Sequence, residues 1–432
     1  MNRVGTIVGA KVLKQTVFSI GLAIWVLSGT TPCPAQSAPD SAALRALVDS
    51  IMPQIEQVSG MKERRPVQFA RPTRAQVETY IEQELDRHYP GGELTATRDL
   101  YADLGLVPDT LDLRRLMLDL YMEQVVGYYD PATKKLYVVR GVPKDSVVPV
   151  LSHELVHALQ DQYVNLDSLI SGKRGNDRQS AAQAAMEGQA TVLMIALMGQ
   201  RLGQRVDIAR LPDLGDKWGT VLQAGYRRYP VFRRAPHIIQ ETLLFPYIRG
   251  SSFMQALARA AEQHGGSGPA PLPFDSLLPQ STEQVLYPDS KFIAQRDTPT
   301  NVVIGPAASG WHIRYQNTMG EFEMSIFLSQ YLGEATGDRD ARGWDGDCIA
   351  LLRGPAGQDA VVWYSVWDDN ASANRFAAAY RRTLAARHGR RGLVTRRQVQ
   401  GRPVVVVVET PAGARPRDVP APALVRLDTR RH

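Results

Sequence analysis

The sequence predicts an α+β fold with a helical amino-terminal lobe, a mixed central region and a small α+β carboxy-terminal domain. Leucines at i, i+4 and i+8 within residues 147–163, and an Ala-, Leu- and Met-rich run over residues 178–206, predict two long helices. Aromatic and β-branched residues around turn sequences at 128–139 and 394–410 predict two hairpins. A hydrophobic content of 44% in 432 residues is sufficient for a large core divided among two or three domains.

The first residues predict a signal peptide over residues 1–37. Arg3, Lys11 and Lys14 precede an apolar run at residues 17–27, and small residues typical of a cleavage site follow. The apolar run is short for a membrane span, and an uncleaved amino-terminal anchor is the alternative. The chain is therefore expected to be exported to the periplasm or the extracellular space. Cleavage after Cys33 would leave only Cys348, so that no internal disulfide could form.

The remaining residues divide into four segments. Two stretches with helical spacing, at 74–87 and 111–123, belong to a helical lobe at 38–125, and residues 126–264 form the central region. Glycine and proline predict a linker or long loop at 265–300. A small α+β domain with a basic tail is expected at 301–432. Its predicted elements are helices at 313–333 and 370–388, strands at 347–353 and 360–367, and the hairpin at 394–410.

Residues 153–157 have the sequence H-E-L-V-H and lie within the first predicted long helix. Residues i and i+4 share a helix face, so His153 and His157 can bind one metal ion while Glu154 lies beside the open coordination position. Only eight histidines occur in the chain, which makes a chance occurrence of this pattern rare. The pattern predicts one catalytic Zn²⁺ ion with Glu154 as general base. The alternative is a helix with two incidental histidines and a salt-bridging glutamate.

A catalytic zinc site takes three protein ligands, so one more must come from elsewhere in the chain. Glu187 is the only acidic residue of the second predicted long helix. A lone carboxylate among alanine, methionine and valine side chains is costly to bury unless it is paired or bound to a metal. Gly188 lowers the helix propensity there and suggests that another segment approaches the backbone closely. Glu187 is the predicted third ligand, and a solvent-facing glutamate is the alternative.

Residues 153–161, with the sequence H-E-L-V-H-A-L-Q-D, resemble the active-site helix of thermolysin-like metallopeptidases. The sequence E-G-Q-A at 187–190 resembles the glutamate-bearing helix of the wider gluzincin group. Further segments resemble exported bacterial proteins of that group: G-Y-Y-D-P at 127–131, F-P-Y at 245–247, S-T-E-Q-V-L at 281–286 and G-W-D-G-D at 343–347. The resemblance implies a thermolysin-like core with an edge strand, the H-E-x-x-H helix and the glutamate helix.

One position departs from the thermolysin pattern. That pattern has an Asp four residues after the glutamate ligand, which orients the first histidine, and this chain has Thr191 there. A metal-bound histidine needs such a hydrogen bond, so either Asp161 or a backbone carbonyl is expected to supply it to His153.

The predicted chemistry is hydrolysis of a peptide bond. Zinc lowers the pKa of a bound water, and Glu154 takes the proton and returns it to the leaving amine. The oxyanion needs a further donor, and the resemblance implies a His or Tyr beyond the glutamate ligand. Tyr247 and His237 are the two candidates, with a core tyrosine and a surface histidine as the alternatives.

The substrate is expected to be a peptide or protein. The resemblance places an edge strand at 136–140, just before the zinc helix, where Leu136, Tyr137 and Val138 would pair with an extended substrate. A hairpin that merely covers the core is the alternative.

The net charge of +6 owes much to arginines after residue 380. This basic carboxy terminus could make weak contact with an anionic envelope surface, with a solvated basic face as the alternative. No nucleic-acid-binding signature accompanies it, so no nucleic-acid partner is expected. Asp345 and Asp347 lack the spacing of an EF-hand, and no calcium site is expected there.

Two classes of function remain open after the sequence alone. The first is an exported zinc endopeptidase; zinc-dependent hydrolysis of a non-peptide amide would use the same residues. The second is a non-catalytic envelope binding or assembly protein in which zinc staples the helix. A structural site usually fills all four coordination positions and has no use for a base, so Glu154 favours the enzyme. The oligomeric state is not indicated.

Overall fold

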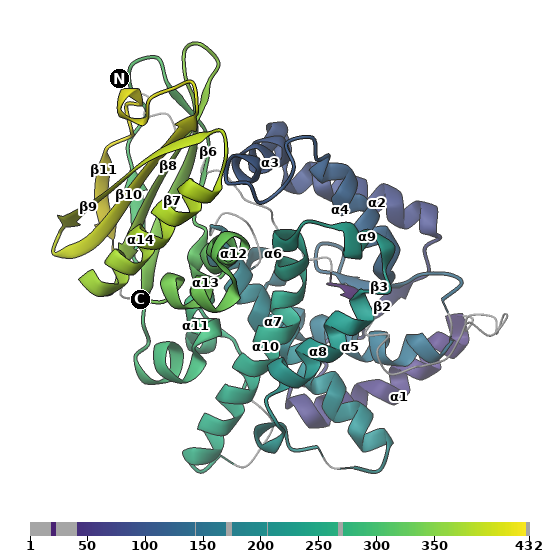
Figure 1. Ribbon diagram of the computed structural model, residues 1–432. Coiled ribbons are helices and arrows are strands. Elements are labelled where there is room, and N and C mark those ends of the chain that lie inside the picture. Colours follow the sequence, from purple (N-terminus) through teal and green to yellow (C-terminus); the bar gives the residue numbers. More distant parts are fainter. Residues whose placement is uncertain are drawn as a thin grey trace, which may run out of the picture.

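The structure is a computed structural model that describes residues 19–22, 41–142, 144–169, 175–204, 206–266 and 271–428. A mostly helical part and a β-sheet domain lie side by side, with the long helices α7 and α10 in the middle of the helical part (Figure 1). The structure is therefore of the α+β class, as predicted.

The amino-terminal lobe is helical, as expected. Thr73 caps the second helix in a capping box with Gln76, which satisfies backbone N–H groups that the first turn leaves unpaired. Both stretches predicted as helices in this lobe are helical. The helices are α1 (Ser41–Ser59), α2 (Arg74–His88), α3 (Glu93–Asp103) and α4 (Leu113–Gln124).

A small sheet with the order β1-β3-β4-β2 packs against helix α5 (Lys144–Tyr163). The predicted hairpin is present, because β3 and β4 pair antiparallel with Tyr128 opposite Tyr137. Most of the predicted signal peptide lies outside the described residues, and the backbone of Ser19–Leu22 pairs antiparallel with β3. The strands are β1 (Ser19–Leu22), β2 (Gln68–Ala70), β3 (Val125–Asp130) and β4 (Lys135–Val138).

Two long helices were predicted in the central region, and both are present as α5 (Lys144–Tyr163) and α7 (Asn176–Arg201). The third long helix, α10 (His237–Gln263), crosses α7 with direct backbone contact. A Cβ atom on Gly188 would lie 2.2 Å from the carbonyl oxygen of Gly250, and one on Gly250 would lie 2.0 Å from the carbonyl oxygen of Ala184. The close approach expected at Gly188 is therefore made by α10. Shorter helices complete the region: α6 (Leu166–Leu169), α8 (Leu214–Tyr226) and α9 (Pro230–Arg234).

The prediction of a linker or long loop at 265–300 is wrong for its second half. Helix α11 (Thr282–Leu286) and a π-helix, η5 (Pro288–Ala294), fold onto α7, α10 and α12. Val285 and Phe292 are buried in the main core. The glycines and prolines at 265–279 led to the loop prediction for the whole segment. The apolar pattern at 282–294 is too short to indicate a helix without knowledge of its packing partners.

The carboxy-terminal domain contains a five-stranded antiparallel sheet with the order β6-β7-β8-β10-β9. The predicted strands at 347–353 and 360–367, the helix at 370–388 and the hairpin at 394–410 are all present. The five consecutive valines at 404–408 lie on β10, and their side chains alternate between the helix-covered core and a second core under β5 and β11. The sheet strands are β6 (His312–Asn317), β7 (Trp344–Arg353), β8 (Asp359–Trp367), β9 (Arg390–Val399) and β10 (Arg402–Pro411).

The helix predicted at 313–333 is wrong in its first part. Residues 312–317 form strand β6, because they pair with β7, and the helix α12 begins only at Gly320. The other elements of the domain are α12 (Gly320–Leu332), α13 (Glu334–Ala341), α14 (Asn370–Ala386), β5 (Asn301–Ile304) and β11 (Leu424–Asp428).

Buried carboxylates join the two parts of the molecule. Asp177, in the first turn of α7, accepts the backbone N–H of Thr282 at 3.0 Å. Glu323 of α12 accepts from Asn176 and, at 3.0 Å, from the hydroxyl of Tyr101. The start of the glutamate helix is thus fixed by residues that follow it by more than a hundred positions.

Asp347 anchors α12 to the sheet. Its carboxylate accepts the backbone N–H groups of Met319 and Gly320, each at 3.0 Å, and the indole N–H groups of Trp344 and Trp363, each at 2.9 Å. Asp345 accepts instead from Thr300, at 2.8 Å, and from Arg402. Among the described residues, none of the helices is both long and apolar enough to cross a membrane.

We predict that Gly188→Ala lowers the free energy of unfolding by about 2–3 kcal/mol, because its methyl group would collide with the backbone of α10 and force the helices apart. Urea denaturation followed by circular dichroism measures the change.

The matched control is Gly219→Ala on α8, which packs on the same α10. Its Cβ would meet only the side chain of Ile248, at 3.5 Å, so we expect a change of at most about 1 kcal/mol, in the stabilising direction. Equal destabilisation by both substitutions would contradict the close helix crossing.

Candidate metal centre

Two helices bring the predicted ligands together. On α5, the H-E-x-x-H spacing places the imidazoles of His153 and His157 one above the other, with their Nε2 atoms 3.1 Å apart. Glu187 reaches them from α7, with its Oε2 atom 3.0 Å from Nε2 of His153 and 3.3 Å from Nε2 of His157. All three side chains are buried, and one ligand atom from each lies within 4.8 Å of the others.

The hydrogen bond on the far side of His157 determines its tautomer. Nδ1 of His157 lies 2.8 Å from Oε1 of Gln160, whose own amide nitrogen donates to the carbonyl of Met186 at 3.0 Å and to Oε1 of Gln189 at 2.9 Å. Both acceptors face the amide nitrogen, so the oxygen of Gln160 must face His157 and accept from Nδ1–H. Nε2 of His157 is then the unprotonated nitrogen, which is the form that binds a metal.

The partner expected for His153 is not Asp161. Asp161 accepts from Nζ of Lys134 at 2.7 Å and from the hydroxyl of Tyr129 at 2.8 Å, so it ties the β3–β4 hairpin to α5. Nδ1 of His153 has no hydrogen-bond partner among the described residues, and neither has the buried hydroxyl of Thr191. The substitution of threonine at this position therefore leaves the first histidine without the carboxylate that the thermolysin pattern would supply.

The two glutamates of the site have opposite electrostatic environments. Burial alone would raise the pKa of Glu187, but the electrostatic influence of His157 and the contacts of the carboxylate with the two imidazoles lower that pKa to about 2. Burial, followed by the negative charge of Glu187, raises the pKa of Glu154 well above its usual value, opposed by the backbone N–H of Tyr129, which donates to Oε2 at 2.7 Å. Glu187 is thus held as an anion, whereas Glu154 has a high proton affinity.

The residues fit a bound divalent cation. Two imidazole nitrogens and a carboxylate oxygen converge, all from buried side chains, and the lone pair of at least one nitrogen points into the space between them. The remaining oxygen of Glu187 and Oε1 of Glu154 are buried without a hydrogen-bond partner among the described residues. A His₂Glu set is the donor set of a catalytic zinc site, which leaves one position open.

Tyrosine hydroxyls flank this centre. The ring of Tyr247, on α10, lies 6.0 Å from the ring of His153, and burial followed by the charge of Glu187 raises the pKa of its hydroxyl. Tyr226, at the end of α8, has a buried hydroxyl without a partner among the described residues, and its pKa is likewise raised by burial, by Tyr229 and by Glu187. Both hydroxyls therefore remain protonated and able to donate.

His237 is not part of the site. It begins α10, ten residues before Tyr247, which corresponds to about 15 Å along the helix axis. Its imidazole is half exposed, and Nδ1 lies 3.8 Å from Oε1 of Glu241. Of the two predicted oxyanion donors, the structure places only Tyr247 beside the ligands. Tyr226 and Gln160 were missed because no motif distinguishes a tyrosine or glutamine that acts at a site from one in a core.

The prediction that β4 is an edge strand is wrong. Leu136 and Tyr137 pair with β3 on one side and, in parallel register, with Phe69 and Ala70 of β2 on the other. Val138 pairs with Gly127 of β3. The strand nearest the site is β3, since the N–H of Tyr129 contacts Glu154. A parallel partner whose paired residues lie 67 positions upstream left no signal in the local sequence pattern.

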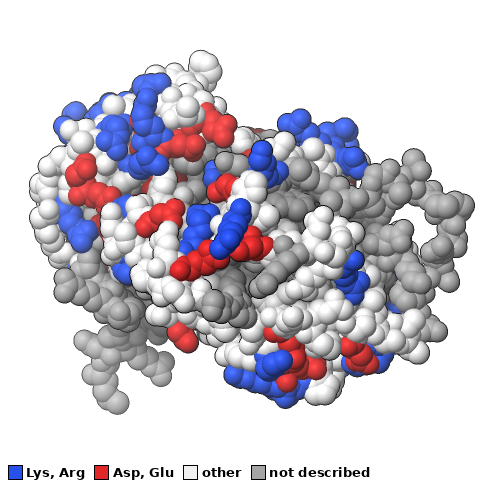
Figure 2. All heavy atoms as spheres, turned by 90° about the horizontal axis from the view of Figure 1, so that it is seen from below, with Lys and Arg blue, Asp and Glu red and all other residues white. Residues whose placement is uncertain are grey.

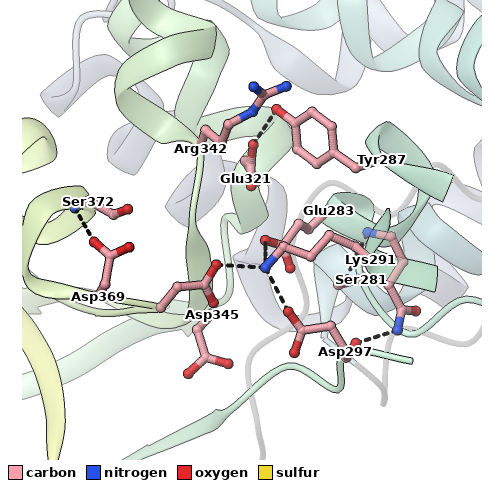
Figure 3. Close-up of polar contacts among 12 residues, drawn as sticks. Ser281, Glu283, Tyr287, Lys291, Asp297, Glu321, Arg342, Asp345, Asp369 and Ser372 are labelled. Atoms are coloured by element: carbon pink, nitrogen blue, oxygen red, sulfur yellow. Dashed lines mark hydrogen bonds and ion pairs between the residues drawn. The ribbon is translucent and has the colours of Figure 1, made fainter. Parts of the chain in front are cut away.

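A second carboxylate cluster lies at the junction of the two parts of the molecule. The ammonium group of Lys291 lies 2.9 Å from Glu283 and 2.7 Å from Asp297 (Figure 3). It also lies 2.6 Å from Asp368. The lysine supplies the positive charge there, so this cluster is an ion-pair network in the described structure. Burial, followed by the charge of Glu321, raises the pKa of Glu283 to about 9.

We predict that Gln160→Met lowers the zinc affinity about 10- to 100-fold while the protein stays folded, because methionine fills the same space but cannot accept from Nδ1–H of His157. Competition with a chromophoric chelator measures the affinity. The control is Gln200→Ala, at the exposed end of α7, which should bind zinc as tightly as the wild type. Unchanged affinity in Gln160→Met would refute the role of this hydrogen bond.

Comparison with known proteins gives one match. A family model described as a domain of unknown function (DUF8575) matches residues 286–418. The match covers η5 and most of the carboxy-terminal domain, and the predicted ligands and Glu154 lie outside it. No curated protein and no solved structure matches the chain.

Proposed function

We propose that this protein is an exported zinc-dependent peptidase with a gluzincin-like site. The observation that carries the proposal is the convergence of His153, His157 and Glu187 from two helices, with Glu154 beside them in the same buried space. A third ligand that sequence spacing could not fix lies 3.0 Å from the first imidazole. Three ligands and an adjacent base are the composition of a catalytic zinc site.

A zinc ion held by these ligands would polarise the scissile carbonyl and lower the pKa of water to near 7. In this step Glu154 would act as the carboxylate, and its Oε1 atom, which has no hydrogen-bond partner among the described residues, would accept the proton. The N–H of Tyr129 orients the other oxygen. Glu154 then returns the proton to the leaving amine.

The two tyrosines have different tasks in this proposal. The hydroxyl of Tyr247 interacts with the carboxylate of Glu187 and orients that ligand. The hydroxyl of Tyr226 has no partner among the described residues and is the donor for the developing oxyanion.

The second candidate is a non-catalytic envelope protein with a structural zinc ion. It is less well supported, because the chain offers three ligands where a structural site usually has four, and because a buried glutamate with a raised pKa next to the ligands is costly without a catalytic role. The proposed export rests on the predicted signal peptide, and the proposed contact of the basic carboxy terminus with an anionic surface remains a minor expectation. On the face in Figure 2, basic and acidic side chains are interspersed.

We predict that Glu154→Gln retains one zinc ion per chain and lowers the rate of peptide hydrolysis by a factor of roughly 10² to 10⁴, since glutamine binds no proton. Zinc-loaded wild type and variant are incubated with a diverse peptide mixture, and new termini are identified by mass spectrometry. In the control, Glu187→Ala should lose zinc. If neither the wild type nor Glu154→Gln cleaves any peptide while both hold zinc, the peptidase proposal fails. The non-catalytic binding protein then becomes the better hypothesis.

For the tyrosines, we predict that Tyr226→Phe lowers kcat roughly 10²- to 10³-fold with zinc affinity and KM little changed, as expected for a group that bonds only the transition state. Tyr247→Phe should mainly weaken zinc binding. Steady-state kinetics on a cleaved peptide, together with zinc titration, separates the two. A normal kcat in Tyr226→Phe would exclude it as the oxyanion donor.

A further inference from the structure

A pocket of about 410 Å³ lies between the start of β3, the segment that precedes α5, and α8. Apolar residues from the start of β3, from the segment between β4 and α5, and from α8 line it: Val125, Val126, Val142, Leu222 and Tyr226. This volume lies within the range of roughly 300–1,000 Å³ that small-ligand sites occupy. The pocket is thus large enough to bind a side chain or a chain end of a substrate.

Arginines surround this apolar wall. Arg74 donates to the backbone carbonyl of Met122, and Nε of Arg140 donates to the carbonyl of Arg71 at 2.7 Å, so both guanidinium groups are held by neutral acceptors. Arg228 lines the pocket as well. None of these three arginines forms an ion pair with another described residue.

The acidic residue of the pocket does not neutralise them. Glu123 accepts the backbone N–H groups of Val231 at 2.8 Å and Phe232 at 3.0 Å, where it caps the start of α9. Three guanidinium groups and one engaged carboxylate leave the pocket with an excess of positive charge.

Two features relate the pocket to the predicted metal centre. Tyr226 lines the pocket, and burial, followed by Tyr229 and the charge of Glu187, raises the pKa of its hydroxyl. Val125 and Val126 begin the strand whose Tyr129 N–H donates to Glu154. A substrate with its scissile bond near Glu154 would therefore place a neighbouring group in the pocket.

We propose that this arginine-rimmed pocket binds a carboxylate of the substrate, so that the protein acts on peptides with an acidic group close to the scissile bond. The inference rests on the proposed peptidase function. The carboxylate belongs either to an Asp or Glu side chain or to the free carboxy terminus of the peptide. Apolar walls with a cationic rim suit both, because the aliphatic part is buried while the charged end meets the guanidinium groups.

The test measures binding without catalysis. Zinc-loaded Glu154→Gln protein is titrated, with fluorescence anisotropy as the readout, against peptides of one neutral sequence that carry a single Asp or Asn at each successive position, with free or amidated carboxy termini. We expect Asp at one or two positions, or a free terminus, to bind about tenfold tighter than its neutral counterpart, and the preference to weaken as salt is raised. Position-dependent Asp binding identifies a side-chain carboxylate, and a dependence on the free terminus identifies the chain end.

Replacing the arginines should remove this preference. In the same background, each of Arg74→Gln, Arg140→Gln and Arg228→Gln should weaken the acidic peptide about twofold to fivefold, and the triple variant about tenfold or more, with the neutral peptide unaffected. The control is Arg382→Gln, an exposed arginine on α14 that should bind both peptides as before. If the triple variant fails to fold, the single variants decide.

Equal binding of acidic and neutral peptides, or a preference that survives in the arginine variants, would overturn the inference. This outcome is separable from failure of the proposed function. If the wild type cleaves peptides without a preference for acidic ones, the proposed peptidase function stands and the pocket inference fails. If it cleaves no peptide but binds acidic peptides through these arginines, the pocket inference stands and the proposed function fails.

Discussion

Burial of the Glu187 carboxylate is the constraint on which the rest of the structure depends. An isolated charge in a helix of alanine, methionine and leucine would be prohibitively unfavourable, and it is tolerated only because two imidazoles face it at 3.0 and 3.3 Å. To bring them there, α7 must lie deep in the core and contact α5 directly. Small residues make this depth achievable, since Gly188 and Gly250 let α7 and α10 cross with their backbones in contact.

A shell of fixed polar groups holds the side chains of the candidate metal centre in place. Gln160 connects His157 to α7 through Met186 and Gln189, so the same amide fixes an imidazole and the spacing of two helices. On the other side of α5, Asp161 binds the hairpin through Lys134 and Tyr129. This contact positions β3, whose backbone orients Glu154. The contacts that pack these elements together are therefore the same contacts that fix the orientation of the side chains in the site.

The carboxy-terminal domain contributes to the site through the first turn of α7. Asp177 and Asn176 are bound by Thr282 and Glu323, and α12 is in turn held on the sheet by Asp347. The segments S-T-E-Q-V-L and G-W-D-G-D, far apart in the sequence, thus meet at one junction with the start of the glutamate helix. The region matched by the family of unknown function therefore supports the predicted metal centre from outside it.

The sequence by itself determined the groups whose geometry is local: His153, Glu154 and His157 share one helix, so their spacing fixes their relation, and the hairpins and the long helices follow from short-range periodicity. Glu187 could be predicted because a lone carboxylate in an apolar helix demands a partner. Only the tertiary structure decided what lies between distant segments. Such features include the parallel partner that covers β4, the distance of His237 from the site, and the pairing of Asp161 with Lys134 and Tyr129 in place of His153. They also include the helices in the expected linker and the contacts of Gln160 and Tyr226. All of them depend on contacts between residues far apart in the chain, and such contacts leave no periodic signal in the sequence.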